Sequence, residues 1–257
     1  RKIIEPLSRR FRVVVPDLRG YNETDKPRGV KNYDIDVLSE DIRQLIKGLG
    51  EEKATIVGHD WGGAILWNIM LRTPEVLDRA VVINLPHPAI FSKAIGRSFR
   101  QTMRSWYFFC FQIPLLPELL LRLFLRPAFW NIFRNWPYQK DAYTHEEVAQ
   151  LRANFKKPGV MRSAINYYRA AFRYRKRHLH GLKKPIAVPT HMIWGENDKA
   201  LGKELTIGTE KYFSGYFKLD YIPKCSHWVM SEYPERVTEI MIEFLHKHLE
   251  GETHART

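Results

Sequence analysis

Apolar runs of strand length alternate with helical periodicity over the first and last thirds of the chain. The apolar runs cover residues 11–15, 54–57, 79–84, 190–194 and 216–222. Apolar residues recur at helical spacing over residues 34–49, 64–72, 203–213 and 234–249, and Asp34 is a favourable N-cap for the first of these helices. Strands that alternate with helices predict an α/β fold, with a mainly parallel sheet covered by helices on both faces.

The pattern changes in the middle of the chain. Residues 88–185 are helical in periodicity, aromatic and basic, and contain no convincing strand. A helical insertion between two strands of a regular sheet predicts a cap over an active site. We therefore expect a core of residues 1–87 and 186–257 and a helical cap of residues 88–185, and the length of 257 residues suits this organisation.

The net charge of +13 is concentrated in the predicted cap. Residues 88–185 hold 19 Lys and Arg against 4 Asp and Glu, whereas the rest of the chain holds 22 against 24. Such a basic surface can meet anionic lipid or polyanions, although a solvated helical face is the more common cause. No nucleic-acid fold signature accompanies the charge, so we expect no nucleic-acid partner.

Residues 106–133 form a very apolar segment of the cap. Gln, Pro, Glu and Arg residues interrupt it, so it is a poor transmembrane span. We expect its helices to face a hydrophobic substrate cavity, with peripheral membrane contact as the alternative. Cys110 and Cys225 give no disulfide framework or metal-ligand pattern, which predicts a reducing, cytoplasmic location with membrane association left open.

The strongest chemical signal is the turn at residues 58–63, with the sequence GHDWGG. An apolar strand breaks there into a helix, which is the pattern of a nucleophile elbow with Asp60 in the place of the usual serine. We expect Gly58 and Gly62 to be required because the turn leaves no room for Cβ atoms. An aspartate in this position can attack a saturated carbon and form an ester, which a partner base must then hydrolyse.

Two later loops supply the partners of Asp60. Asp198 follows the fourth apolar run, and His227 follows the fifth. The order of nucleophile, acid and histidine is that of the α/β-hydrolase triad. We expect His227 to draw a proton from water and Asp198 to fix its tautomer, with Glu196 as the weaker alternative for the acid.

Taken together, these motifs make the chain resemble the epoxide hydrolase branch of the α/β-hydrolase superfamily. The supporting residues are Arg-Gly-Tyr at 19–21 with Asp-Lys-Pro at 25–27, the GHDWGG elbow, GENDKAL at 195–201 and CSHW at 225–228. The resemblance covers essentially the whole chain. It implies hydrolysis of an epoxide to a vicinal diol, with no cofactor and no metal.

The resemblance also implies that two cap tyrosines bind and protonate the epoxide oxygen. Tyr168 lies in the matching Asn-Tyr-Tyr-Arg motif at 166–169, and Tyr107 precedes Phe-Gln-Ile-Pro at 111–114. Such an acid is needed because an alkoxide is a poor leaving group. The backbone N–H of Trp61 is expected to lie in the oxyanion hole.

Two rival functions stay open. The Trp61 indole N–H could instead hold a halide, as in haloalkane dehalogenases, which share the Asp-Trp elbow but need no tyrosine pair. Fluoroacetate dehalogenases are less similar, because they carry arginines where this chain has residues 61–63. The second rival is a non-catalytic fragment that acts through a basic membrane- or partner-binding cap. The apolar cap suggests a lipophilic substrate, and the oligomeric state is not predicted.

One expected motif is missing. The His-Gly-x-Pro loop, which supplies the second oxyanion-hole N–H in the family, occurs nowhere in the sequence. Its strand would lie between residues 11–15 and residues 54–57, so its absence would leave a gap inside the sheet. We therefore expect an N-terminally incomplete chain that folds poorly and turns over little by itself, with any upstream targeting segment out of view.

Three further residues or motifs have weaker chemical signals. His178-x-His180 shows no third metal ligand in the sequence, so a surface role is expected. His87, between two prolines at the entrance to the cap, is expected to be structural, and Cys225 to be a small loop residue.

Overall fold

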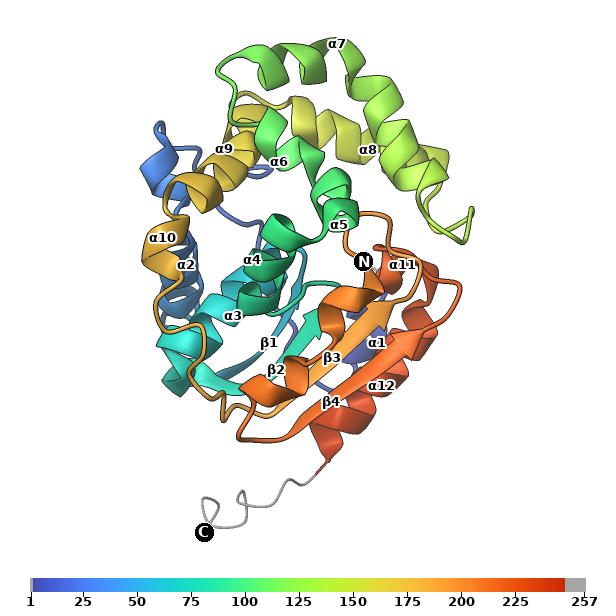
Figure 1. Ribbon diagram of the computed structural model, residues 1–257. Coiled ribbons are helices and arrows are strands. Elements are labelled where there is room, and N and C mark those ends of the chain that lie inside the picture. Colours follow the sequence, from blue (N-terminus) through green and yellow to red (C-terminus); the bar gives the residue numbers. More distant parts are fainter. Residues whose placement is uncertain (1, 248–257) are drawn as a thin grey trace.

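A four-stranded parallel sheet forms the centre of the protein. The computed structural model describes residues 2–247. The strands are β1 (Ala54–His59), β2 (Leu77–Ile83), β3 (Thr190–Gly195) and β4 (Phe217–Ile222), and they lie side by side in chain order (Figure 1). All four coincide with predicted apolar runs, and their parallel pairing is confirmed.

The prediction of a further strand at residues 11–15 is wrong. In the part of the chain that the structure describes, this segment pairs with no strand, and Val14 and Val15 are exposed. A strand exists through hydrogen bonds to a neighbour, so an apolar run alone does not ensure one. β1 is one edge of the described sheet, and Val57 on it is 38% exposed.

Helices cover both faces of the sheet, as predicted (Figure 1). They are α1 (Ile4–Ser8), α2 (Ile35–Gly48), α3 (Trp61–Arg72), α11 (Val229–Glu232) and α12 (Pro234–His246). Along β2, Ala80 and Val82 belong to the core cluster that contains α2 and α3, whereas Val81 and Ile83 belong to the cluster that contains α1 and α12. This alternation is the period-2 signature of a strand buried on both sides.

One helix prediction needs correction, and the end of another cannot be compared with the structure. Instead of one helix at residues 203–213 there are two 3₁₀ turns, η4 (Lys203–Thr206) and η5 (Thr209–Tyr212), because Gly208 between them has a φ of 83°. α12 ends at His246, and Leu249, the predicted end, lies outside the described residues. The N-cap prediction is confirmed, since the side chain of Asp34 accepts the Asp36 N–H at 3.0 Å. The remaining 3₁₀ turns are η1 (Val30–Tyr33) and η2 (Pro74–Val76).

The elements found between residues 88 and 185 are all helical. They are α4 (Pro88–Arg97), α5 (Phe99–Arg104), α6 (Trp106–Cys110), α7 (Leu116–Trp130), the π-helix η3 (Asn131–Asn135), α8 (His145–Lys156), α9 (Val160–Arg173) and α10 (Arg175–His178). α7 and α8 lie at the end of the molecule away from the sheet (Figure 1). Within residues 2–247, no helix is long and apolar enough to cross a bilayer.

The Arg-Gly-Tyr turn at residues 19–21 supports helix α9. Gly20 has a φ of 90°, and a Cβ there would lie 2.6 Å from the Ser163 Cβ, so only glycine allows this approach. The Ser163 hydroxyl lies 2.7 Å from the Tyr33 hydroxyl, and the Tyr167 hydroxyl donates to the Arg19 carbonyl at 2.7 Å. The motif therefore places the cap helix that carries Tyr168.

Candidate active site

The predicted nucleophile lies on a strained turn between β1 and α3. Asp60 has a φ of 50°, which costs about 1–3 kcal/mol for a residue with a Cβ. A Cβ on Gly58 would lie 2.5 Å from the Gly62 carbonyl oxygen, so the turn requires glycine there. The same expectation for Gly62 is wrong, because a Cβ on it would meet nothing within 4 Å. The second crowded position is Gly63, where a Cβ would lie 3.0 Å from the Leu85 Cβ.

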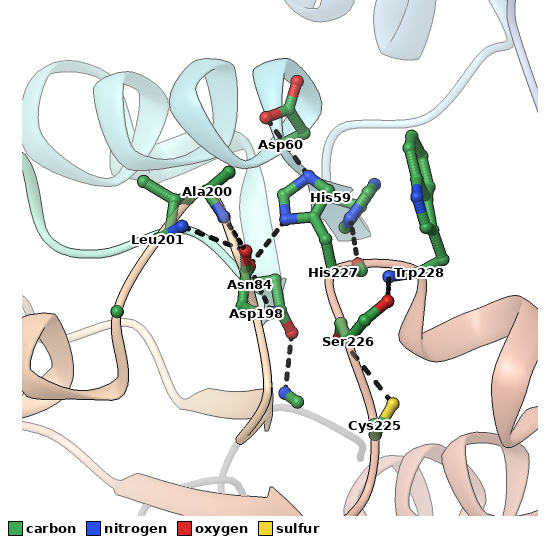
Figure 2. Close-up of polar contacts among 12 residues, drawn as sticks. His59, Asp60, Asn84, Asp198, Ala200, Leu201, Cys225, Ser226, His227 and Trp228 are labelled. Atoms are coloured by element: carbon green, nitrogen blue, oxygen red, sulfur yellow. Dashed lines mark hydrogen bonds and ion pairs between the residues drawn. The ribbon is translucent and has the colours of Figure 1, made fainter. Parts of the chain in front are cut away.

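The three triad residues meet at the carboxyl ends of the strands. Nδ1 of His227 lies 2.7 Å from Oδ2 of Asp198, and its Nε2 lies 3.5 Å from Oδ1 of Asp60. Figure 2 shows the imidazole between the two carboxylates. Asp60, Asp198 and His227 follow β1, β3 and β4, so the parallel sheet brings residues far apart in the sequence to one edge.

Asp198 is held by three further donors. The backbone N–H groups of Ala200 and Leu201 donate to its Oδ1 at 2.8 and 2.9 Å, and the side chain of Asn84 donates to its Oδ2 at 2.7 Å (Figure 2). Sequence reasoning assigned no role to Asn84, whose only signal was its position at the end of an apolar run. Glu196, the alternative acid, is instead paired with Lys203.

The triad is charged at neutral pH. Burial would raise the pKa of Asp60, but its hydrogen bond to His227 and the charge of that histidine lower it. Burial likewise opposes ionisation of Asp198, whose pKa is lowered by the charge and hydrogen bond of His227. For His227, burial would lower the pKa, but the charges and hydrogen bonds of both carboxylates raise it to about 10. The contacts among the three groups therefore favour the charged form of each, an imidazolium between two carboxylates.

A neighbouring histidine behaves in the opposite way. Burial and the charge of His227 lower the pKa of His59 to about 4, so it is neutral. Its Nε2 lies 2.9 Å from the backbone carbonyl oxygen of His227 (Figure 2). His59 therefore adds no second positive charge and contacts the backbone of the histidine loop.

The two predicted cap tyrosines lie beside each other, close enough to Asp60 for its charge to act on both. The rings of Tyr107 on α6 and Tyr168 on α9 are 5.7 Å apart and nearly perpendicular. Burial raises the pKa of each phenol, and the charge of Asp60 raises both further. Both phenols are therefore protonated donors within the electrostatic field of that carboxylate.

Trp61 and Tyr21 also lie near Asp60. The Trp61 ring packs edge-to-face on Tyr168 at 5.0 Å, and the hydrogen bond of the Trp61 backbone N–H helps His227 to lower the pKa of Asp60. Burial raises the pKa of Tyr21, and the charge of Asp60 adds to this effect. Tyr21 belongs to a motif that sequence reasoning recognised, but its position beside the nucleophile was missed.

Arg169 and Gln112 tie the segment after α6 to α9. The Arg169 guanidinium donates to the Phe111 carbonyl at 2.9 Å and the Ile113 carbonyl at 3.0 Å, and pairs with Glu118 at 2.6 Å. The Gln112 side chain donates to the Tyr168 carbonyl at 3.3 Å. These bonds fix the two tyrosine-bearing helices relative to each other.

Glu232 holds the histidine loop and was missed by sequence reasoning. Its carboxylate accepts the Ser226 N–H at 2.9 Å and the Ser226 hydroxyl. It also accepts the backbone N–H groups of Tyr138 and Gln139 at 2.6 and 2.9 Å. One buried acid thus joins the loop of His227 to the segment between η3 and α8.

The weaker candidates have roles outside the triad. His87 caps α4, where its Nδ1 accepts the Ala89 N–H at 3.2 Å, and its ring stacks on Tyr212 at 3.9 Å. Cys225 is buried, which raises the pKa of its thiol, and both Cys225 and Cys110 are free thiols.

The surroundings of His178 differ from expectation. The sequence showed no further metal ligand, yet Asp34 and Asp36 lie close enough for the three side chains to hold a cation. The guanidinium of Arg177 already contacts both carboxylates, at 3.2 and 2.9 Å, and Arg72 lies 3.4 Å from Asp36. In this structure the cluster is an ion-pair network that joins the start of α2 to α10.

A nucleophile on a strand-to-helix turn, followed by an acid and a histidine at the ends of later strands, defines an α/β hydrolase. The chain matches the family model described as alpha/beta hydrolase fold over residues 1–234. It is 35% identical over 241 residues to Epoxide hydrolase 4 of Homo sapiens, an alignment that covers 91% of this chain and 65% of that protein. It is also 35% identical over 248 residues to the AB hydrolase superfamily protein YfhM of Bacillus subtilis (strain 168), covering 91% and 80%.

A solved structure agrees with these relatives. The crystal structure of a mutant epoxide hydrolase from Bacillus megaterium has a TM-score of 0.82 and 30% identity, and covers 96% of this chain and 88% of that one. The chain therefore belongs to the α/β-hydrolase family and, within it, to the epoxide hydrolases, which confirms the predicted fold class and resemblance. It spans about two thirds of the length of Epoxide hydrolase 4.

Proposed function

We propose that the protein hydrolyses a lipophilic epoxide to a vicinal diol through a covalent ester on Asp60. The observation that carries this proposal is the position of Tyr107 and Tyr168, two protonated phenols in the field of the Asp60 carboxylate. A nucleophile on one side and acids on the other suit a strained ring whose oxygen must be protonated as it leaves. The names of the relatives support the same chemistry.

In the first half of the reaction, a carboxylate oxygen of Asp60 attacks a ring carbon. The carbon–oxygen bond of the epoxide breaks, and one phenol gives its proton to the leaving oxygen while the other donates a hydrogen bond. The raised pKa values of Tyr107 and Tyr168 keep these groups protonated until the alkoxide forms. The product is a hydroxyalkyl ester and a phenolate.

The second half begins with a change in charge. The ester is neutral, so His227 loses one of the two negative charges that raise its pKa. The proton that it then gives up restores the phenol, and the neutral imidazole accepts a proton from water that attacks the ester carbonyl. Asp198 stabilises the returning imidazolium, and the Trp61 N–H faces the oxyanion. Collapse of this intermediate breaks the ester bond. The proton of the carboxyl group formed on Asp60 passes to the leaving alkoxide, which releases the diol and restores the Asp60 carboxylate beside the imidazolium.

A single-turnover experiment in oxygen-18 water tests the proposal. With the enzyme in excess, the label should enter the Asp60 carboxylate, where peptide mass spectrometry detects it, and the diol should carry unlabelled oxygen. His227→Gln should accumulate the ester, seen as a peptide heavier by the mass of the substrate. Label found only in the diol would instead indicate direct attack of water and contradict the covalent route.

Assays with haloalkanes distinguish the rival activity, haloalkane dehalogenation, from epoxide hydrolysis. The Trp61 ring faces Tyr168, so its indole is near the reacting centre, as a halide-binding group would have to be. A dehalogenase should release halide from a chloroalkane and keep that activity in Tyr168→Phe. An epoxide hydrolase should lose most of its activity in the same variant, because one of the two phenols that assist its leaving group is gone.

A further inference from the structure

Helix α7 presents an apolar stripe to the outside of the molecule. Four of its exposed apolar residues follow a spacing of three and four residues, which places them on one face: Leu116, Leu119, Leu120 and Leu123. Phe124, where the helix is kinked, is exposed as well. Leu119 and Leu123 are 54% and 65% exposed. A stripe of this spacing normally faces a protein core, whereas the buried contacts of α7 are made by other residues, Pro117, Leu125 and Phe129.

The helices that precede α7 also carry exposed apolar residues. Phe99 on α5 is 82% exposed, and further large apolar side chains are exposed along the chain, namely Met103, Trp106, Phe109, Ile113 and Leu115. We call these residues and the α7 stripe the cap apolar face. Scattered single apolar residues need no explanation, but a face this large marks contact with a membrane or another protein.

Basic side chains accompany the cap apolar face. Arg100 on α5 and Arg122 and Arg126 on α7 are exposed, and none of them pairs with an acid among residues 2–247. A groove of about 730 Å³ runs between α7 and the α8–α9 connection. Its walls combine apolar with basic side chains, among them Leu119, Phe155, Arg122, Lys156 and Arg162.

The charge selects among the surfaces that could cover this face. A second copy of the chain is disfavoured because both copies carry the same excess of 19 basic over 4 acidic residues in residues 88–185. A nucleic acid would match the charge but leave the leucines in water. An anionic bilayer satisfies both features, since it accepts apolar side chains below its headgroups and attracts arginine and lysine to its surface.

We propose that the cap apolar face docks on the surface of an anionic phospholipid bilayer. The leucines and aromatic residues of α5–α7 enter the interface, Arg100, Arg122 and Arg126 contact headgroups, and the chain does not cross the bilayer at these helices. α6 carries Trp106 and Phe109 on this face and Tyr107 toward the candidate active site, so docking places the bilayer behind the tyrosine. The proposal does not depend on the reaction at Asp60.

Vesicle co-sedimentation of the complete protein tests this contact. Vesicles of phosphatidylcholine, with and without phosphatidylserine, are compared at physiological and raised ionic strength. We expect Leu119→Gln/Leu123→Gln to weaken binding to both kinds of vesicle by at least about tenfold, because two large apolar groups no longer enter the interface. Arg122→Gln/Arg126→Gln should weaken binding about tenfold to the anionic vesicles alone and reduce its salt dependence.

A matched control tests whether vesicle binding depends on the cap apolar face or on any exposed apolar residue. Ile207 is a surface residue outside the cap and is 74% exposed. Ile207→Gln should therefore bind vesicles like the unchanged protein. Far-UV circular dichroism and the thermal midpoint verify that each variant is folded. The proposal is overturned if the unchanged protein does not bind anionic vesicles, or if Leu119→Gln/Leu123→Gln binds equally well. It is also overturned if sedimentation without lipid reveals a dimer that this variant abolishes, since the face would then join two copies.

Discussion

The hydrolase core and the helical cap hold their parts of the candidate site by different means. In the core, Asp60, Asp198 and His227 follow β1, β3 and β4 of one parallel sheet. Asn84 follows the remaining strand, β2. Backbone N–H groups and buried side chains surround the acid of the triad. The positions of these groups are thus determined by sheet register, which a single substitution hardly alters.

The cap holds Tyr107 and Tyr168 on helices that also carry exposed side chains. Their positions depend on a few long-range contacts, chiefly the bonds of Arg169 and the packing of α9 against Gly20. In the proposed reaction, the nucleophile and the base are therefore positioned by the sheet, whereas the two acids, Tyr107 and Tyr168, are positioned by the packing of the cap. We call these the base half and the acid half of the proposed chemistry. Substitutions should affect the two halves differently.

The largest effect is expected for Asp198→Asn in the core. The amide would set an N–H group against the donors of His227 and Asn84, which disturbs the tautomer of the histidine. We expect kcat for epoxide hydrolysis to fall by roughly 10³–10⁴. Asp220→Asn is the matched control, because Asp220 lies 2.8 Å from His191 in another core pair outside the triad. Equal losses in both variants would point to general destabilisation.

A smaller loss is expected for Tyr168→Phe in the cap. The remaining phenol of Tyr107 can still protonate the leaving oxygen, so kcat should fall about 10²-fold, and further in the double variant. Tyr174→Phe, at the C-terminal end of the same helix, should retain activity. Steady-state kinetics with the same epoxide checks both variants. An unchanged kcat in Tyr168→Phe would contradict the role of this cap tyrosine as a proton donor.

Raising the pH should destabilise the core through His227. Its pKa is raised from the ordinary value of 6.5 to about 10 in the folded protein, so its stabilising effect is complete below pH 6.5 and is lost as the pH rises through 10. Between pH 7 and 9 we expect a loss on the order of 3 kcal/mol in the free energy of unfolding. Urea titrations of the protein and of His227→Gln should show this slope in the former and a flatter one in the latter.

The smallest effect is expected where Gly20 packs against helix α9 of the cap. Gly20→Ala forces a Cβ against Ser163 at a φ of 90°, which should cost about 1–2 kcal/mol and loosen α9. Gly48→Ala, where a Cβ meets nothing within 4 Å, should be neutral or slightly stabilising. Thermal midpoints measure both. A decrease in kcat for Gly20→Ala, without a change in the triad, would show that the cap controls the acid half.

Local patterns in the sequence were sufficient for β1–β4 and for α2 and α3, and they supplied the triad residues as a prediction. Strand length, helical spacing and turn glycines are properties of neighbouring residues, so the elbow at Asp60 and the loops of Asp198 and His227 could be recognised without a structure. The tyrosine motifs could be recognised in the same way, although their convergence on Asp60 could not.

Only the tertiary structure decided the features that depend on partners far away in the chain. Residues 11–15 have a strand-like composition but no strand beside them, and residues 203–213 have helical spacing but are divided at Gly208. Asn84 and Glu232 acquire their roles from groups more than 90 residues away along the chain. The leucine stripe of α7 has the spacing of a core face, and only the packing of the cap turns it outward. Amino-acid type determines what a segment can form, and the surfaces it meets determine which of those possibilities is realised.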